Sequence, residues 1–150
     1  MVTPETERTF LEDVLLGNRQ AIEFCIACGQ LSQIVDDIID CDKPLIKSDV
    51  VAAFHSALVT IPLNPFYREN IEILAPVLTV IFSDYNASVE LEQLSPHDKT
   101  LAYVLRDNFI SLITICAVIV GGARYGIECT TRVRQFFHDE TLETYLENLS

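Results

Sequence analysis

Apolar residues recur every three or four positions along nearly the whole chain, and this spacing constrains the fold more than any other feature. Leu11, Val14 and Leu15 begin the pattern and Ile22 continues it. Residues spaced in this way share one face of an α-helix. No stretch alternates apolar and polar residues as a half-buried β-strand does. The sequence therefore predicts an all-α protein, a single compact helical bundle over residues 1–150.

Helix starts are marked by a capping side chain followed by proline at the first helical position. Such pairs occur at Thr3-Pro4, Asn64-Pro65 and Ser95-Pro96. Asp98 completes a pattern that resembles a capping box with Ser95. Ser48 and His138 are two further expected starts. Together these signals predict five or six helices, over residues 4–41, 48–60, 65–93 with a bend at Pro76, 97–124, 127–137 and 139–148.

Three aspartates close the first predicted helix. Asp36 and Asp40 are one turn apart and Asp37 lies beside them, while Gln33 and Gly29 continue the same stripe backwards. Carboxylates in a last helical turn face the negative end of the helix dipole and repel one another. A divalent cation, a nearby lysine or solvent must compensate. A glycine within a helix costs about 1 kcal/mol relative to alanine, which indicates that another group approaches closely.

The run from Gly29 to Asp40 resembles the second aspartate-rich motif of trans-prenyl diphosphate synthases, members of the class I isoprenoid synthase family. That motif reads roughly G-x-x-F-Q-I-x-D-D-I-L-D. The matching positions are Gly29, Gln33, Ile34, Asp36, Asp37, Ile38 and Asp40. The resemblance implies isoprenoid-synthase-like helix packing and a Mg²⁺ site formed by Asp36, Asp37 and Asp40, with Gln33 in support. It also implies a diphosphate ligand bridged by the metal.

A diphosphate site would need more carboxylates and cations than this run supplies, and the chain contains no D-D-x-x-D motif. Glu69 and Glu72, three residues apart, are candidates for a second carboxylate pair that faces the aspartates. Arg68, Arg106 and Arg124 are candidates for binding phosphate oxygens, because guanidinium groups match their geometry. The sequence singles out none of these three arginines.

Charge and cysteine content narrow the function classes. The 22 acidic and 10 basic residues give a formal charge of −12, which argues against direct binding of nucleic acid. The 5 cysteines lack the spacing of a zinc site and are expected to be buried free thiols. Met1–Asp13 is polar and acidic, so we expect no signal peptide and a cytoplasmic protein. The most apolar stretch, Phe109–Gly122, is too short to span a bilayer and is expected to be a buried central helix.

His97 and Asp98 also form the residue pair found in metal phosphohydrolases of the HD type, but capping alone explains an aspartate in a first helical turn.

Three functions remain. The first is a small acidic interaction or structural protein without catalytic apparatus, able to self-associate or bind a protein partner. The alternative is a Mg²⁺-dependent protein or enzyme that binds a diphosphate, such as an isoprenoid diphosphate, through Asp36, Asp37 and Asp40. The third is an acidic inhibitor of a basic or nucleic-acid-binding protein. We expect the first, because one carboxylate group cannot by itself hold a three-metal diphosphate site.

Overall fold

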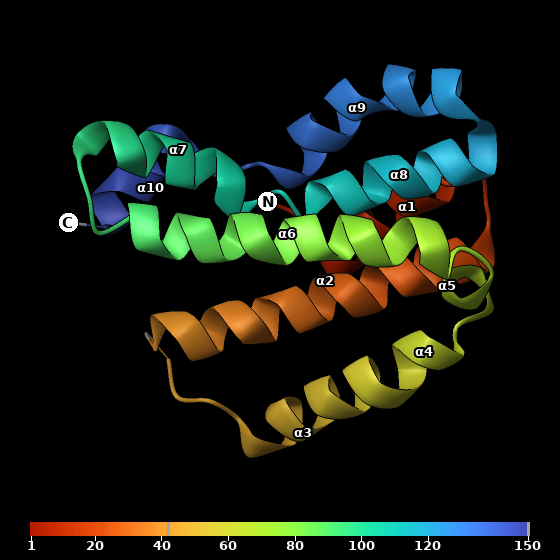
Figure 1. The fold of residues 1–150 in the computed structure, drawn as a ribbon, viewed down its shortest axis with the longest axis horizontal. Coiled ribbons are helices and arrows are strands. Elements are labelled where there is room, and N and C mark those ends of the chain that lie inside the picture. The colour runs from red at the N-terminus through yellow and green to blue at the C-terminus, as the bar shows by residue number, and fades with distance from the viewer. Residues whose placement is uncertain (42, 150) are drawn as a thin grey trace.

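The computed structural model describes residues 1–41 and 43–149, and every regular element in these two ranges is helical. This confirms the all-α prediction. Figure 1 shows α2 and α6 as long helices that run side by side, with α8 and α9 on one side of them and α3 and α4 on the other. The elements are α1 (Pro4–Val14), α2 (Arg19–Asp40), α3 (Lys47–His55), the π-helix η1 (Ser56–Thr60), α4 (Ile61–Leu63), α5 (Pro65–Glu69), α6 (Ile71–Leu91), α7 (Pro96–Arg106), α8 (Ile110–Gly121), α9 (Ala123–Phe137) and α10 (Leu142–Asn148).

The structure has more helical segments than the five or six that were predicted, because three of the predicted helices are each divided. Leu16 and Gly17 have left-handed φ angles of 53° and 70°, which separate α1 from α2. Asn70 separates α5 from α6, and residues 107–109 separate α7 from α8. In contrast, α3, η1 and α4 follow one another without interruption, and α6 continues through Pro76.

The proline-marked helix starts are confirmed. Thr3 and Ser95 each form a capping box, and the Ser95 hydroxyl accepts a hydrogen bond from the Asp98 N–H at 3.2 Å. Asn64 accepts one from the Tyr67 N–H at 3.0 Å. Each side chain satisfies a backbone donor that the first helical turn leaves unpaired.

The two expected starts without a proline, at residues 48 and 139, lie close to the observed starts at Lys47 and Leu142 but do not coincide with them. The third helix begins at Lys47, one residue before Ser48, and no side chain caps it. The last helix begins at Leu142 rather than after His138, because Thr141 is the residue that caps it and accepts from the Thr144 N–H.

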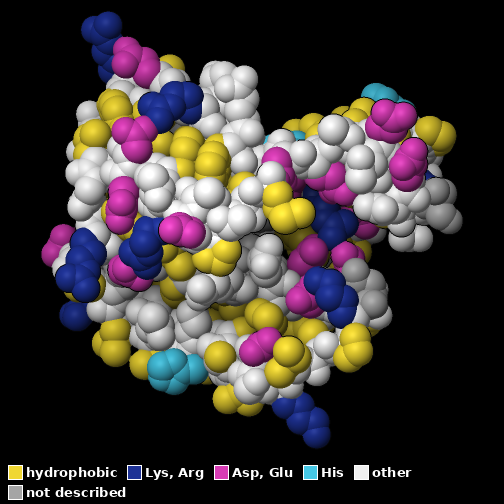
Figure 2. All heavy atoms as spheres, turned by 180° about the vertical axis from the view of Figure 1, so that it is seen from behind, with side chains coloured by type: hydrophobic (Ala, Val, Ile, Leu, Met, Phe, Trp, Pro, Cys, Tyr) yellow, Lys and Arg dark blue, Asp and Glu magenta, His cyan; other side chains and the backbone are white. Residues whose placement is uncertain are grey.

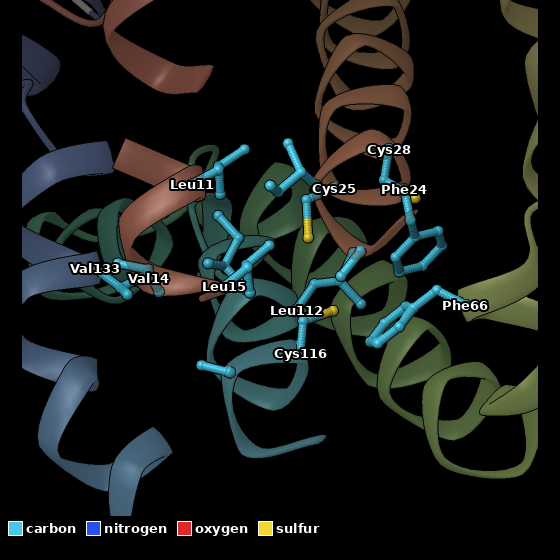
Figure 3. Close-up of a cluster of buried hydrophobic side chains, with 14 of the residues drawn as sticks. Leu11, Val14, Leu15, Phe24, Cys25, Cys28, Phe66, Leu112, Cys116 and Val133 are labelled. Atoms are coloured by element: carbon cyan, nitrogen blue, oxygen red, sulfur yellow. The ribbon is translucent and has the colours of Figure 1, made fainter. Parts of the chain in front are cut away.

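The hydrophobic core lies where α1, α2 and α8 meet, and α5, α6 and α9 add to it. Figure 3 shows Leu11 and Leu15 of α1 and Cys25 of α2 gathered over Leu112 and Cys116 of α8. The expectation of buried free thiols is confirmed for Cys25, Cys28, Cys116 and Cys129, whereas Cys41 is exposed. α8 buries five side chains, so the prediction of a buried apolar helix in this stretch is also confirmed.

α8 and α9 pack closely because of small residues at their contact. A methyl group added to Gly126 of α9 would collide with the Val118 side chain of α8 and would lie 3.0 Å from the Val118 backbone nitrogen. Gly122, with a φ of 92°, provides the turn between the two helices. The glycines therefore set both the turn and the distance between this pair of helices.

One stretch has the length and apolar character of a membrane-spanning helix. By these two criteria alone, Pro96–Gly121 could cross a bilayer. Of the 18 consecutive residues with the highest mean hydropathy in this stretch, 28% are buried. The core helix of a soluble protein has the same character. This stretch comprises α7 and α8, with Arg106 and Asp107 between its ends. The absence of a membrane span stays a prediction.

Candidate functional site

The structure separates the three aspartates of the predicted metal site into two groups. Asp36 and Asp40, one turn apart near the end of α2, both accept hydrogen bonds from Arg106 of α7, at 2.7 and 2.6 Å from its Nη2. Asp37 instead forms an ion pair with Lys43, at 2.7 Å. Gln33 is exposed one turn earlier. Arginine and lysine side chains thus compensate the carboxylates at this helix end.

A third carboxylate meets the same arginine from the other side. Glu92, which follows α6, accepts a hydrogen bond from Nη1 of Arg106 at 3.1 Å and is only 8% exposed. Tyr145 of α10 donates to Glu92 at 2.5 Å, and Tyr85 of α6 donates to Asp36 at 2.9 Å. We call these six residues the Arg106 cluster: Asp36, Asp40, Tyr85, Glu92, Arg106 and Tyr145.

The cluster joins four elements that are distant in sequence. α2 supplies two aspartates, α6 and the residue after it supply Tyr85 and Glu92, and α7 and α10 supply Arg106 and Tyr145. In the rear view of Figure 2, acidic and basic side chains gather where the lobe that contains α7 and α10 meets the rest of the molecule. The cluster therefore links this lobe to the end of α2.

Burial and charge determine the protonation states of the donors. Burial lowers the pKa of Arg106, but its hydrogen bond to Asp40 and the charges of Asp36, Asp40 and Glu92 outweigh that effect and raise the pKa above the usual arginine value. Burial, and then the hydrogen bond to Asp36, raise the pKa of Tyr85. Burial and Glu92 do the same for Tyr145. Arg106 thus remains charged and both phenols remain hydrogen-bond donors.

One cation faces three carboxylates in this cluster. Arg106 uses both terminal nitrogens, which is the way a guanidinium fork binds several oxygens. The remaining negative charge is shared with the tyrosine hydroxyls and with solvent, because Asp36 and Asp40 are about one third exposed. Chemically, the arrangement suits a stable ion network between helices.

The predicted metal site would need this network to open. Among residues 1–41 and 43–149, no three histidine, cysteine, aspartate or glutamate side chains are grouped so that they could hold a metal ion. Asp36 and Asp40 already direct carboxylate oxygens at Arg106. Binding of Mg²⁺ by Asp36, Asp37 and Asp40 with support from Gln33 stays a prediction, and it would require Arg106 to leave two of these residues.

The candidate second carboxylate pair lies far from the aspartates. Glu69 lines a hollow of about 450 Å³ near Asn18, at the opposite end of α2. The 18 residues from Asn18 to Asp36 correspond to roughly 27 Å of helix. Glu72 lies in the first turn of α6, about 20 Å along that helix from Tyr85. Neither glutamate is brought together with the Arg106 cluster.

Of the three candidate arginines, only Arg106 contacts the aspartates. Arg124 pairs with Glu128 on the surface of α9. Arg68 is exposed in the last turn of α5. In the sequence Arg106 was a candidate only because a guanidinium can bind phosphate oxygens, and the same reason applied equally to Arg68 and Arg124. Nothing local connected Arg106 to Asp36, which is 70 residues away.

Asp98 has a structural role that explains its position after His97. Its carboxylate accepts a hydrogen bond from the Ser95 N–H at 3.1 Å. Hydrogen bonds from Ser95 lower the pKa of Asp98. The capping interpretation of this pair is therefore confirmed.

The groups nearest to Gly29 belong to other parts of this chain. A methyl group built at this position would lie 3.5 Å from an Oε1 atom of Glu7 and 3.8 Å from the ring of Phe109. These are ordinary van der Waals distances, so α1 and the residue before α8 leave room for an alanine. The close contact expected at Gly29 is with neighbouring helices, and it does not require glycine.

Comparison with family models, with curated proteins and with solved structures finds no match to this chain.

Proposed function

We propose that this chain is a structural protein that acts through contacts with other protein molecules, and that the Arg106 cluster holds its fold together. The observation that carries the proposal is the contact of Arg106 with Asp36, Asp40 and Glu92 at once. A guanidinium in this position supplies the compensating charge that the aspartates need. The cluster then requires no ligand to be stable.

Surface composition supports an interaction role. Among the described residues, 19 large hydrophobic side chains are exposed, nearly as many as the 22 apolar residues in the core. Single exposed apolar residues are common on protein surfaces, but contiguous groups mark interaction sites. The largest succession along the chain lies in α3, η1 and α4.

Thermal unfolding with and without ligand tests the proposal. The wild-type chain is compared alone, with Mg²⁺, with geranyl diphosphate, and with both. We expect no shift in Tm that needs both compounds. We expect Asp36→Asn/Asp40→Asn to unfold at lower temperature than the wild type, because Arg106 loses two of its three carboxylate partners.

The second candidate function is Mg²⁺-dependent binding of a diphosphate. It is favoured by the position of Arg106, whose guanidinium can bind phosphate oxygens, beside Asp36 and Asp40. Ligand at a hundred times its dissociation constant adds about 2.7 kcal/mol of stability, which is easily measured. A Tm increase that needs both metal and diphosphate, and that Asp36→Asn/Asp40→Asn abolishes, would overturn the structural proposal in favour of this one.

A further inference from the structure

The continuous helical run of α3, η1 and α4 carries its large apolar side chains on the outside. Val51, Phe54 and Leu58 are 69%, 63% and 73% exposed, and Val59 and Leu63 are exposed as well. Val51, Phe54 and Leu58 are spaced by three and four residues and Val59 and Leu63 by four, which places the members of each group on one side of the helix, and Leu58 and Val59 adjoin. We call these five residues the α3–α4 face.

The opposite side of the same run, which packs on α2, carries two alanines and one isoleucine. Ala53 and Ile61 are buried there and Ala57 is half-buried. A surface helix normally buries its large apolar residues and exposes polar ones. Here five of the large apolar side chains face outward, so the α3–α4 face is a helix surface that residues 1–41 and 43–149 leave uncovered.

Charge distinguishes this face from the rest of the surface. The chain has a net charge of −12, yet residues 45–63 contain only Lys47 and Asp49 among the Asp, Glu, Lys and Arg types. Figure 2 shows hydrophobic side chains with few charged ones along its lower edge, where α3, η1 and α4 lie. Two molecules of this acidic protein repel each other at most orientations, but they can approach at this face without placing like charges in contact.

We infer that the α3–α4 face binds the same face of a second copy of this chain. The inference rests on the proposed function and names its partner. The five side chains offer on the order of 500 Å² of apolar surface, and with their flanking atoms this approaches the roughly 800 Å² that each partner buries in a standard interface. A two-fold interface uses the same surface on both copies, so the uncharged face is complementary to itself.

An antiparallel arrangement fits the shape of the face. Lys47, Val51 and His55 line an open, mainly apolar hollow of about 590 Å³. If the two-fold axis passes beside Phe54, Leu58 of the second copy lies against Val51 and enters this hollow. The same arrangement places Lys47 near the C-terminal end of the other copy's helical run, where the helix dipole favours a cation.

Sedimentation equilibrium of the full chain with matched variants tests this pairing. We expect the wild type to approach twice its monomer mass of 16.9 kDa as concentration rises. Phe54→Asp should weaken self-association at least tenfold, because it places a charge in an apolar interface. Phe82→Asp is the control: Phe82 is 56% exposed on α6, outside the face, and its substitution should leave the association unchanged. Circular dichroism checks that both variants keep their helical content.

A pair of complementary substitutions tests the orientation and covers the case in which Phe54→Asp does not fold. Val51→Lys and Leu58→Glu should each be monomeric alone. Mixed in equal amounts they should associate, because the antiparallel pairing brings the introduced lysine opposite the introduced glutamate at one end and leaves the native pair at the other. Association between the two variants in the mixture therefore supports the inference.

Other occupants would give different results. A wild type that stays monomeric overturns the inference, as does association lost equally in Phe54→Asp and Phe82→Asp. Cosedimentation of monomeric wild type with phosphatidylglycerol vesicles, lost in Phe54→Asp, would assign the face to a lipid surface instead. The negative charge of the chain and the single lysine in residues 45–63 argue against an anionic membrane. None of these outcomes changes the test with Mg²⁺ and diphosphate. The proposed function and the inferred pairing can therefore each be overturned without the other.

Discussion

Arg106 is the residue on which the ion cluster depends. Among the described residues, Arg106 is the only cation that contacts Asp36, Asp40 and Glu92, and Arg106→Met removes it. The buried Glu92 then keeps only the hydrogen bond from Tyr145. We expect the free energy of unfolding to fall by about 2–4 kcal/mol, somewhat below the usual loss for a buried pair because the two aspartates are partly solvated. Urea unfolding followed by circular dichroism measures this difference.

A surface arginine provides the matched control for that experiment. Arg124 is 93% exposed and pairs with Glu128 one turn along α9. Arg124→Met should change the free energy of unfolding by no more than about 0.5 kcal/mol, as expected for an exposed pair. Equal losses in the two variants would show that Arg106 contributes no more than an ordinary surface charge.

Gly29 tests how closely α1 and Phe109 pack against the aspartate-rich helix. The space beside it accepts a methyl group at van der Waals distance. Gly29→Ala should therefore raise the free energy of unfolding by about 0.5–1 kcal/mol, through the higher helix propensity of alanine. Thermal unfolding measures the gain. A loss of stability would mean that the neighbouring helices leave no room for a methyl group at this position.

Glu7 gives the stability of the fold a specific dependence on pH. Burial raises the pKa of Glu7 above its usual value of 4.5, and the nearby Arg8 opposes this only in part. Because the folded state disfavours the charged form, Glu7 destabilises the fold increasingly as pH rises through its folded pKa. Below the unfolded pKa the penalty is absent. Glu7→Gln should therefore stabilise the protein at pH 7 and have little effect near pH 4, measured by urea unfolding at both values.

At the scale of helices, the contact between α8 and α9 is the most sensitive to an added atom. Gly126→Ala places a methyl group against the Val118 side chain and 3.0 Å from its backbone nitrogen. Since backbone cannot move aside cheaply, we expect a loss of about 1–3 kcal/mol. Gly29→Ala is the control, because it makes the same substitution inside a helix that has room for it. A stable Gly126→Ala variant would mean that the two helices can separate without cost.

Helix starts could be predicted where the signal was local, and helix breaks could not. Ser95 and Asp98 cap a helix through bonds within one turn, so the sequence around Pro96 was sufficient. The break after α1 depends on left-handed backbone at Leu16, a residue with no preference for that conformation. Gly17 and Asn18 complete the turn, as a glycine with left-handed φ and as the residue that caps α2, and the spacing of apolar residues alone did not identify them.

The same difference applies to the candidate site. Asp36 and Asp40 could be placed on one helix face because their spacing decides it. Their partner Arg106 comes from another helix, and Glu92 and Tyr145 were not anticipated at all. A contact across 70 residues depends on the whole arrangement of α2, α6 and α7. Only the unbalanced charge at the end of α2 indicated that a cation or solvent must compensate the aspartates.

In the molecule as a whole, two regions differ strongly in charge. The Arg106 cluster gathers three carboxylates, of which Glu92 is buried, around one cation, and the α3–α4 face is almost free of charge in a chain of −12. Long-range repulsion between two copies therefore acts against an association that apolar contacts favour. Because the Debye length falls from about 30 Å at 0.01 M salt to about 8 Å at 0.15 M, added salt screens this repulsion.

Self-association should therefore become stronger as ionic strength rises. Between 0.02 and 0.2 M NaCl we expect the dimer dissociation constant to fall several-fold, because screening removes repulsion while the apolar contact is unaffected. Sedimentation equilibrium across this range measures it. MgCl₂ at matched ionic strength is the decisive comparison. An equal effect of the two salts means that Mg²⁺ acts as a screening ion, as expected if Arg106 already occupies the oxygens of Asp36 and Asp40. A larger effect of MgCl₂ that Asp36→Asn/Asp40→Asn removes would instead locate a bound metal at the end of α2.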